Sequence, residues 1–243
     1  MKYHLKIVAV IVLAVLSTAV LVHVRGADWR TADRSSVGIA PSPEQFSGAV
    51  IQVYAARTFG WRGALAVHTW IATKNKDAKN YIVHQVLGWR KYRNLPVVSS
   101  QADIPDRNWF NNKPVLLVDL RGPEAGRLVN KVLAAVQAYP YQHEYTMWPG
   151  PNSNTFTAFI GRSVPELKLN LPPTAIGKDY LPHNRFYASA PSGSGHQVSI
   201  YGLAGIIISR EEGLELNILG LDFGINPLKP SIRLPGFGTV GTR

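Results

Sequence analysis

Cysteine is absent from the 243 residues of this chain. Its absence excludes disulfide bonds, thiolate nucleophiles and thiolate metal sites. The sequence also lacks a GxGxxG turn, a Walker loop and an HExxH motif, so it carries no nucleotide or zinc-peptidase fingerprint. A metal site on His68 and His84 would need a third ligand such as His143 or Glu144, at no recognisable spacing. We therefore expect no cofactor and no resident metal.

Charged residues are scarce, at 17%, and acidic ones are the scarcer kind, with 15 Asp and Glu against 26 Lys and Arg. The hydrophobic content of 46% is typical of a globular chain with a sizeable core. The basic excess concentrates between residues 57 and 93, where Asp77 is the single acid. Such a region fits anionic lipid headgroups or acidic envelope polymers. An ordinary solvated surface is the alternative.

The N-terminus carries Lys2 and Lys6 before an uncharged apolar run from residue 7 to residue 22. The length of the run, and the lack of a small-x-small cleavage site before Arg25, favour a transmembrane anchor over a cleaved signal peptide. With the two lysines in the cytoplasm, the rest of the chain faces the periplasm of a bacterium, although further arginines follow the run. We therefore predict the bacterial inner membrane as a partner and expect no nucleic acid.

The chain divides into an anchor or signal segment at 1–25, a linker at 26–48 and a single α+β domain at 49–243. Pro123 opens a helix whose apolar residues recur at helical spacing. The C-terminal part predicts a β-hairpin, and the tail after residue 226 shows no periodicity. Strands are predicted at 49–56, 64–73, 81–89 and 115–120, and the hairpin arms at 197–208 and 214–223. The expected fold is an antiparallel sheet with packed helices.

Residues 148–159 read WPGPNSNTFTAF, in which Pro and Gly interrupt the chain just before an apolar segment. Asn152, Ser153, Asn154 and Thr155 all suit a helix N-terminus. We place Ser153 at the start of a short helix, where free backbone N–H groups favour negative charge. A nucleophile or an oxyanion would be positioned there. The alternative is an ordinary N-cap.

Two of the seven histidines, His68 and His84, lie in predicted strands that pair through a short turn. A catalytic interpretation makes Ser153 the nucleophile and His68 the base that accepts its proton. His84, or the amide of Gln85, would orient His68. The alternative is that both histidines pack in the core.

The strand residues His68-Thr-Trp-Ile71, followed later by Asn152-Ser-Asn-Thr-Phe156 at a helix start, resemble the circularly permuted papain-like enzymes. These include desumoylating isopeptidases, lecithin:retinol acyltransferase-like proteins and relatives of the NlpC-type cell-wall peptidases. The resemblance covers about residues 50–167 and implies His68 as the family histidine and, less closely, His84 as the third polar residue. Ser153 stands where that group has its nucleophilic cysteine, and serine lacks the low pKa of a thiol.

The whole chain, including Gly193-Ser-Gly195 and Leu219-Gly-Leu221, is also similar to a proteobacterial membrane-associated family, DUF3750, to which no reaction is assigned. Two functions follow. The first is a hydrolase or acyltransferase acting on amide or ester bonds of envelope material through Ser153 and His68. The second is a non-catalytic binding or scaffold module of the envelope, and a purely structural envelope protein is a third. The distance between Ser153 and His68 distinguishes the first function from the other two, because only catalysis requires these side chains to meet.

Overall fold

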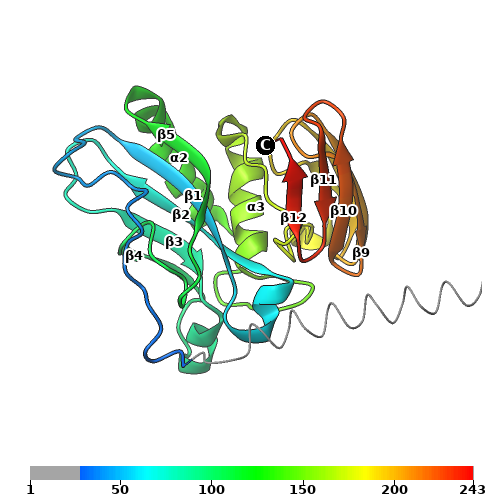
Figure 1. Ribbon diagram of the computed structural model, residues 1–243, viewed down its shortest axis with the longest axis horizontal. Coiled ribbons are helices and arrows are strands. Elements are labelled where there is room, and N and C mark those ends of the chain that lie inside the picture. The colour runs from blue at the N-terminus through cyan, green and yellow to red at the C-terminus, as the bar shows by residue number, and fades with distance from the viewer. Residues whose placement is uncertain (1–27, 243) are drawn as a thin grey trace, which may run out of the picture.

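The computed structural model describes residues 28–242 (Figure 1). The anchor predicted at residues 1–25 lies outside the described residues. Between residues 28 and 242, no helix has both the length and the apolar character needed to cross a bilayer.

The first half of the chain forms a five-stranded antiparallel sheet in the order β4-β3-β2-β1-β5. β1 and β2 pair along their whole lengths, from Val50 opposite Lys74 to Arg57 opposite Val67. The four predicted strands are confirmed as β1, β2, β3 and β5, and β4 lies in a stretch where no strand was predicted. The strands are β1 (Val50–Arg57), β2 (Val67–Lys74), β3 (Ile82–Val86), β4 (Val98–Ala102) and β5 (Val115–Arg121).

Two helices cover one face of this sheet. α2 (Pro123–Ala138) begins at the predicted proline and packs against β1, β5 and the second helix. That helix, α3 (Ser153–Ser163), packs against β2 and β3. The core between sheet and helices includes Ile51, Ile71 and Phe156, all fully buried, because alternate residues of each strand point to this side.

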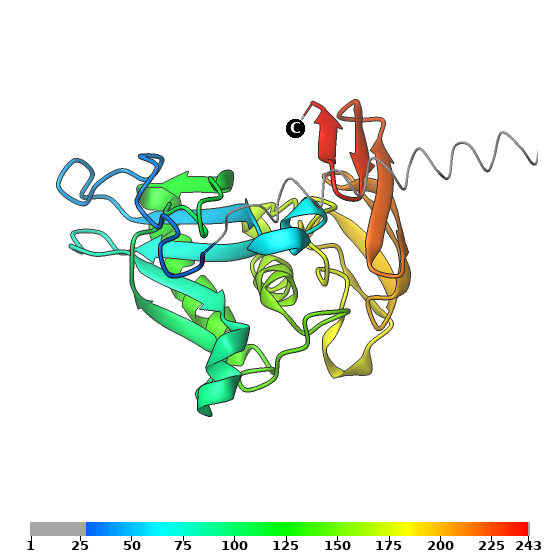
Figure 2. The same cartoon turned by 60° about the horizontal axis from the view of Figure 1, so that its bottom comes forward.

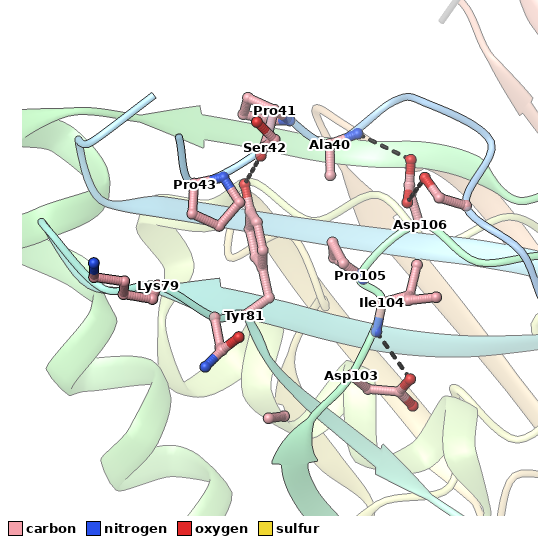
Figure 3. A pocket seen from close by; sticks show the side chains of 13 residues that line it. Ala40, Pro41, Ser42, Pro43, Lys79, Tyr81, Asp103, Ile104, Pro105 and Asp106 are labelled. Carbon is pink, nitrogen blue, oxygen red and sulfur yellow. Dashed lines mark hydrogen bonds between the residues drawn. The ribbon is translucent and has the colours of Figure 1, made fainter. Parts of the chain in front are cut away.

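Residues 32–46, predicted to be part of a linker, pack along the other face of the sheet. The buried Asp106 carboxylate accepts hydrogen bonds from Ser36 Oγ (2.7 Å) and from the backbone N–H of Ala40 (3.1 Å). Tyr81 donates its hydroxyl proton to a backbone carbonyl of the same segment (2.8 Å; Figure 3). A hollow of about 460 Å³ lies beside these contacts. Three of the polar residues that line it, Ser36, Tyr81 and Asp106, are thus engaged in holding the segment to the sheet.

The second half of the chain forms a seven-stranded antiparallel sheet in which each strand pairs with the next. The predicted hairpin is confirmed at its turn, between β8 and β9, but each predicted arm divides into two strands, β7 with β8 and β9 with β10. The tail predicted to lack periodicity contributes β11 and β12. The strands are β6 (Tyr187–Ser189), β7 (Gly195–Ile200), β8 (Ala204–Ser209), β9 (Gly213–Ile218), β10 (Leu221–Asn226), β11 (Ser231–Leu234) and β12 (Gly238–Gly241). α3 lies between the two sheets in both views (Figures 1 and 2). The predicted α+β class with antiparallel sheets is therefore confirmed.

The inner side of the seven-stranded sheet carries charge. Lys178 Nζ lies 2.9 Å from Asp179, 2.8 Å from Glu215 and 3.1 Å from Asp222, and Arg233 Nε lies 2.5 Å from Glu215. These five residues, all buried, are called the Lys178 cluster. Burial alone would lower the pKa of Lys178, but the three carboxylates raise it above its ordinary value. Burial and the neighbouring Asp179 raise the pKa of Asp222.

Candidate functional site

The N-terminus of α3 is capped by Asn152. Its Oδ1 accepts hydrogen bonds from the backbone N–H of Asn154 (2.9 Å) and of Thr155 (3.2 Å), and Thr155 Oγ1 accepts the N–H of Asn152 (3.1 Å). This reciprocal arrangement is a capping box. A Cβ atom at Gly177 would lie 2.3 Å from Asn152 Nδ2, so only glycine lets the following loop approach this cap. The first turn of α3 is therefore fixed from both sides.

Ser153 is the first residue of α3 and is buried, with 7% of its surface exposed. Its carbonyl oxygen accepts hydrogen bonds from the hydroxyls of Thr69 (3.3 Å) and Thr157 (3.1 Å). Within residues 28–242, its own hydroxyl makes no hydrogen bond to any side chain. The predicted position at the helix start is observed, but the cap belongs to Asn152, and no base lies within hydrogen-bond distance of the Ser153 oxygen.

His68 lies on the face of β2 that points away from α3. The next residue, Thr69, places its hydroxyl 3.0 Å from Asn154 Oδ1 and 2.9 Å from Thr157 Oγ1 of α3. Neighbouring residues of a strand point to opposite faces, so His68 faces the other side of the sheet. There its ring stacks on Trp109 with centroids 3.8 Å apart.

The surroundings of His68 suit a neutral packed imidazole. Its Nε2 lies 3.1 Å from Gln85 Oε1, the amide considered as an orienting group. Burial lowers the pKa of His68 to about 4, against a smaller opposing effect of the Gln85 hydrogen bond. The ring therefore stays uncharged near neutral pH, donates to Gln85 and stacks on Trp109, while the Trp70 ring lies farther away, with its centre 5.7 Å from that of His68.

His84 lies on the α3 face, because it pairs with Ile71, a residue of the core under the helices. Its Nε2 lies 3.0 Å from Thr73 Oγ1 and its Nδ1 lies 2.8 Å from Ser100 Oγ. Both ring nitrogens are thus engaged by hydroxyl groups. Burial lowers the pKa of His84 to about 4, so this ring is also neutral at physiological pH.

The structure does not bring the three predicted catalytic residues together. Ser153 and His84 lie on the helix side of the five-stranded sheet, and His68 lies on the opposite side with Trp109. The reason is the register between β2 and β3. Ile71 pairs with His84, so the odd-numbered residues of β2 share the face of His84, whereas His68 points to the other face. Among residues 28–242, no three His, Asp or Glu side chains are grouped to hold a metal ion.

An aromatic and basic surface lies at the edge of the His68 side and is centred on Phe110. The Arg34 guanidinium carbon lies 4.4 Å from the centre of the Phe110 ring, and the ring centres of Phe59 and Trp89 lie 5.5 Å and 6.2 Å from it. Trp89 also stacks on Trp109 at 5.9 Å, which connects this surface to His68.

Two short 3-10 helices, η1 (Gly60–Ala64) and η2 (Gly88–Arg93), extend this surface. Both reach Phe110, η1 through Phe59, which immediately precedes it, and η2 through Trp89. A Cβ atom at Gly88 would lie 2.6 Å from the Tyr145 ring, and Arg62 and Tyr92 both act on this phenol, whose pKa is raised chiefly by burial. Together these residues form what we call the Phe110 surface. Its members are Arg34, Phe59, Trp61, Arg62, Trp89, Lys91, Tyr92, Arg93 and Phe110.

Exposure on the Phe110 surface is unusual for aromatic side chains. Tyr92 exposes 90% of its surface, Trp61 51% and Trp89 45%, and Lys91 and Arg93 are exposed beside them. The Arg90 side chain has a different role, since its Nε donates to the carbonyl of Pro96 (2.6 Å). The basic composition of residues 57–93 pointed to this region. Nothing in the sequence around Trp109 and Phe110 indicated that they would join it.

A family model described as "Protein of unknown function (DUF3750)" matches residues 48–180, which is more than half of the chain. The matched segment contains the five-stranded sheet, both helices and the loop with Lys178, and it ends before β6. No curated protein and no solved structure matches the chain.

Proposed function

We propose that this chain, which belongs to the DUF3750 family, is a non-catalytic binding module of the bacterial cell envelope that holds anionic lipid headgroups on its Phe110 surface. The observation that carries the proposal is the gathering of exposed Trp, Tyr, Lys and Arg side chains around Phe110. Aromatic rings with a polar edge settle at the headgroup level of a bilayer. Lysine and arginine beside them attract anionic lipid, by about 1 kcal/mol for each residue near the surface.

The position of this surface along the chain supports a membrane partner. Arg34 contacts Phe110, and its guanidinium also binds the carbonyl of Trp29, so the surface includes the start of the described residues. The apolar run proposed as an inner-membrane anchor ends at Val22. Six residues then lead to Asp28 and span at most about 20 Å. The Phe110 surface would therefore lie close to the periplasmic side of that membrane.

The absence of catalysis is proposed from the separation of Ser153 and His68. A serine hydroxyl is a weak nucleophile unless a base takes its proton. His68 turns to the other face of β2, where it stacks on Trp109 and burial lowers its pKa, which keeps the ring neutral. We propose that the similarity to permuted papain-like enzymes reflects an inherited fold, with serine at position 153 marking a lost reaction.

Lipid binding is tested with the full-length chain in nanodiscs. Because the chain has no cysteine, Tyr92→Cys accepts a single environment-sensitive fluorophore at the most exposed ring of the surface. Discs that contain phosphatidylglycerol should shift its emission to the blue and protect it from an aqueous quencher, compared with discs of phosphatidylcholine alone. Adding Lys91→Glu and Arg93→Glu should remove the difference, since about 2 kcal/mol of attraction is lost and repulsion replaces it.

The matched control carries Arg127→Glu. Arg127 is an exposed arginine on α2 that lies outside the Phe110 surface, and its replacement changes the net charge by the same amount as each of the other two substitutions. It should keep the lipid-dependent shift. Equal emission in both kinds of disc would refute the lipid proposal. Protection that requires an added acidic polysaccharide instead would point to the envelope polymer as the ligand.

The lack of a nucleophile is tested separately with a fluorophosphonate probe that acylates activated serine. The wild-type chain should remain unlabelled, and Ser153→Cys should react with iodoacetamide no faster than a cysteine introduced at Ser163, the last residue of α3. Labelling of the wild type that disappears in Ser153→Ala would overturn the non-catalytic proposal and restore the hydrolase or acyltransferase hypothesis.

A further inference from the structure

The seven-stranded sheet is reversed relative to a usual two-layer protein, because its outer side is the apolar one. Along β9, Glu215 and Asn217 are buried whereas Leu214, Leu216 and Ile218 are exposed. The same alternation holds on the neighbouring strands. The outer apolar face, as we call it, consists of Val198, Ile200, Ile206, Ile208, Leu214, Leu216, Ile218, Phe223, Ile225, Ile232, Leu234 and Val240, each between 37% and 62% exposed.

The strand register arranges these side chains in continuous rows across the sheet. One row runs Val198–Ile206–Leu216–Phe223 over four strands. The next runs Ile208–Leu214–Ile225–Ile232–Val240 over five strands. Rows of β-branched and aliphatic side chains without charges are what the inner faces of β-sandwiches present to each other. The outer apolar face therefore has the composition of half of a protein core.

We infer that the outer apolar face is covered by the same face of a second copy of this chain, in a two-fold symmetric dimer with two sheets packed face to face. Twelve side chains that are about half exposed offer on the order of 1,000 Å² per copy, above the roughly 800 Å² per partner of a stable interface. A two-fold axis lets one surface complement itself without a second protein.

The shape of the outer apolar face also fits the same face of a second copy. A hollow of about 290 Å³ lies between β9, β10 and β11 and is lined by apolar side chains including Leu216, Phe223 and Ile232. Side chains of an opposing sheet interdigitate in such hollows at an intersheet distance of about 10 Å. A lipid surface fits less well, because anionic headgroups attract lysine and arginine, and the outward positions of β7 to β12 carry neither. The exposed Lys91 and Arg93 lie instead on the Phe110 surface.

The absence of native cysteine makes the dimer directly testable in the full-length chain in its own membrane. Leu216→Cys and Ile225→Cys place single thiols in the two rows, and Arg127→Cys places one on α2 as the control. A bismaleimide with a span of about 10 Å matches the expected distance between packed sheets. Both row variants should give a band of twice the monomer mass, and the control should not. With two differently tagged copies in one cell, the band should carry both tags.

A charge in the face should abolish the product. Leu216→Asp in the Ile225→Cys background should reduce the cross-linked fraction by about tenfold or more, because the carboxylate would be buried without a partner. Unchanged resistance to limited proteolysis shows that this variant remains folded, since position 216 points away from the Lys178 cluster.

Two results would overturn the inference. If the row cysteines remain monomeric and react quickly with a water-soluble maleimide, the face is uncovered. If they remain monomeric but protected, or link to a band of another mass, lipid or a different protein covers it. Neither result bears on the lipid proposal for the Phe110 surface, which is read out at position 92.

Discussion

The two sheets of this protein are both antiparallel and rich in β-branched residues, yet they place their apolar side chains in opposite ways. The five-stranded sheet buries apolar groups on both faces, under α2 and α3 on one side and under residues 32–46 on the other. The seven-stranded sheet buries the Lys178 cluster and exposes aliphatic rows. The difference shows that α3 and the loop behind it offer an apolar partner to the first sheet and a polar one to the second.

The consequence is energetic. Burial of apolar surface stabilises the first sheet in the ordinary way. On the inner face of the second sheet, buried positive and negative groups neutralise one another. Removing one of them leaves a buried charge without a partner, which strongly destabilises the fold. Family membership follows the same division, since the matched residues include the first sheet and Lys178 but none of the second sheet.

The largest effect is expected from Lys178→Met. Three carboxylates surround this ammonium group within 3.1 Å, and without it they repel one another in a buried site. The free energy of unfolding should fall by about 3–5 kcal/mol, measured by urea denaturation of the detergent-solubilised chain. Lys131→Met, which removes an exposed pair with Glu166, should cause no measurable change. A small effect at Lys178 would mean that water enters the cluster.

Ile71→Ala probes the first sheet in the same way. Ile71 is fully buried between β2 and the helices, so the truncation leaves a cavity and should cost about 2–5 kcal/mol at any protein concentration. Leu216→Ala removes a similar side chain from the outer apolar face. Its effect should depend on protein concentration, as expected when the lost contact is between subunits. Concentration-independent loss at both positions would contradict the contrast between the sheets.

Acidification should weaken the first sheet through its two histidines. Burial lowers the pKa of His68 and of His84 to about 4 in the folded chain, whereas an unfolded histidine titrates near 6.5. The unfolded state therefore binds more protons between these values, and stability falls as the pH drops from about 6.5 to about 4, by at most about 3 kcal/mol for each ring. His68→Phe keeps the stack on Trp109 and should remove about half of this dependence. An unchanged slope in that variant would place the titrating group elsewhere.

The smallest effects are expected at the start of α3, which both sheets share. Asn152→Ala removes the capping box and should cost about 1–2 kcal/mol. Ser153→Ala removes a hydroxyl without a hydrogen-bond partner among the described residues and should change stability by less than about 0.5 kcal/mol. A larger loss at Ser153 than at Asn152 would mean that the serine hydroxyl has a structural partner.

The sequence correctly predicted most of the first sheet and both described helices, because the short apolar run at residues 115–120 and the helical spacing after Pro123 are local signals. It also correctly placed Ser153 in the first turn of a helix. The catalytic arrangement stays a prediction that the geometry does not support, since the face on which His68 lies depends on the register between β2 and β3. A shift of one residue moves every side chain to the other face.

Residues 214–218 read LELNI, in which apolar and polar side chains alternate. The sequence likewise shows the lack of cysteine and the excess of basic residues between 57 and 93. The amino-acid order thus determined the strands, the helices and the chemistry available to the chain. Only the tertiary structure decided which side of the second sheet is buried. An alternating strand has one apolar and one polar face, and the layer packed against the sheet determines which face is covered. That layer, α3 with Lys178 and Asp179 behind it, is polar, and it turned the charged side inward and left the aliphatic side exposed.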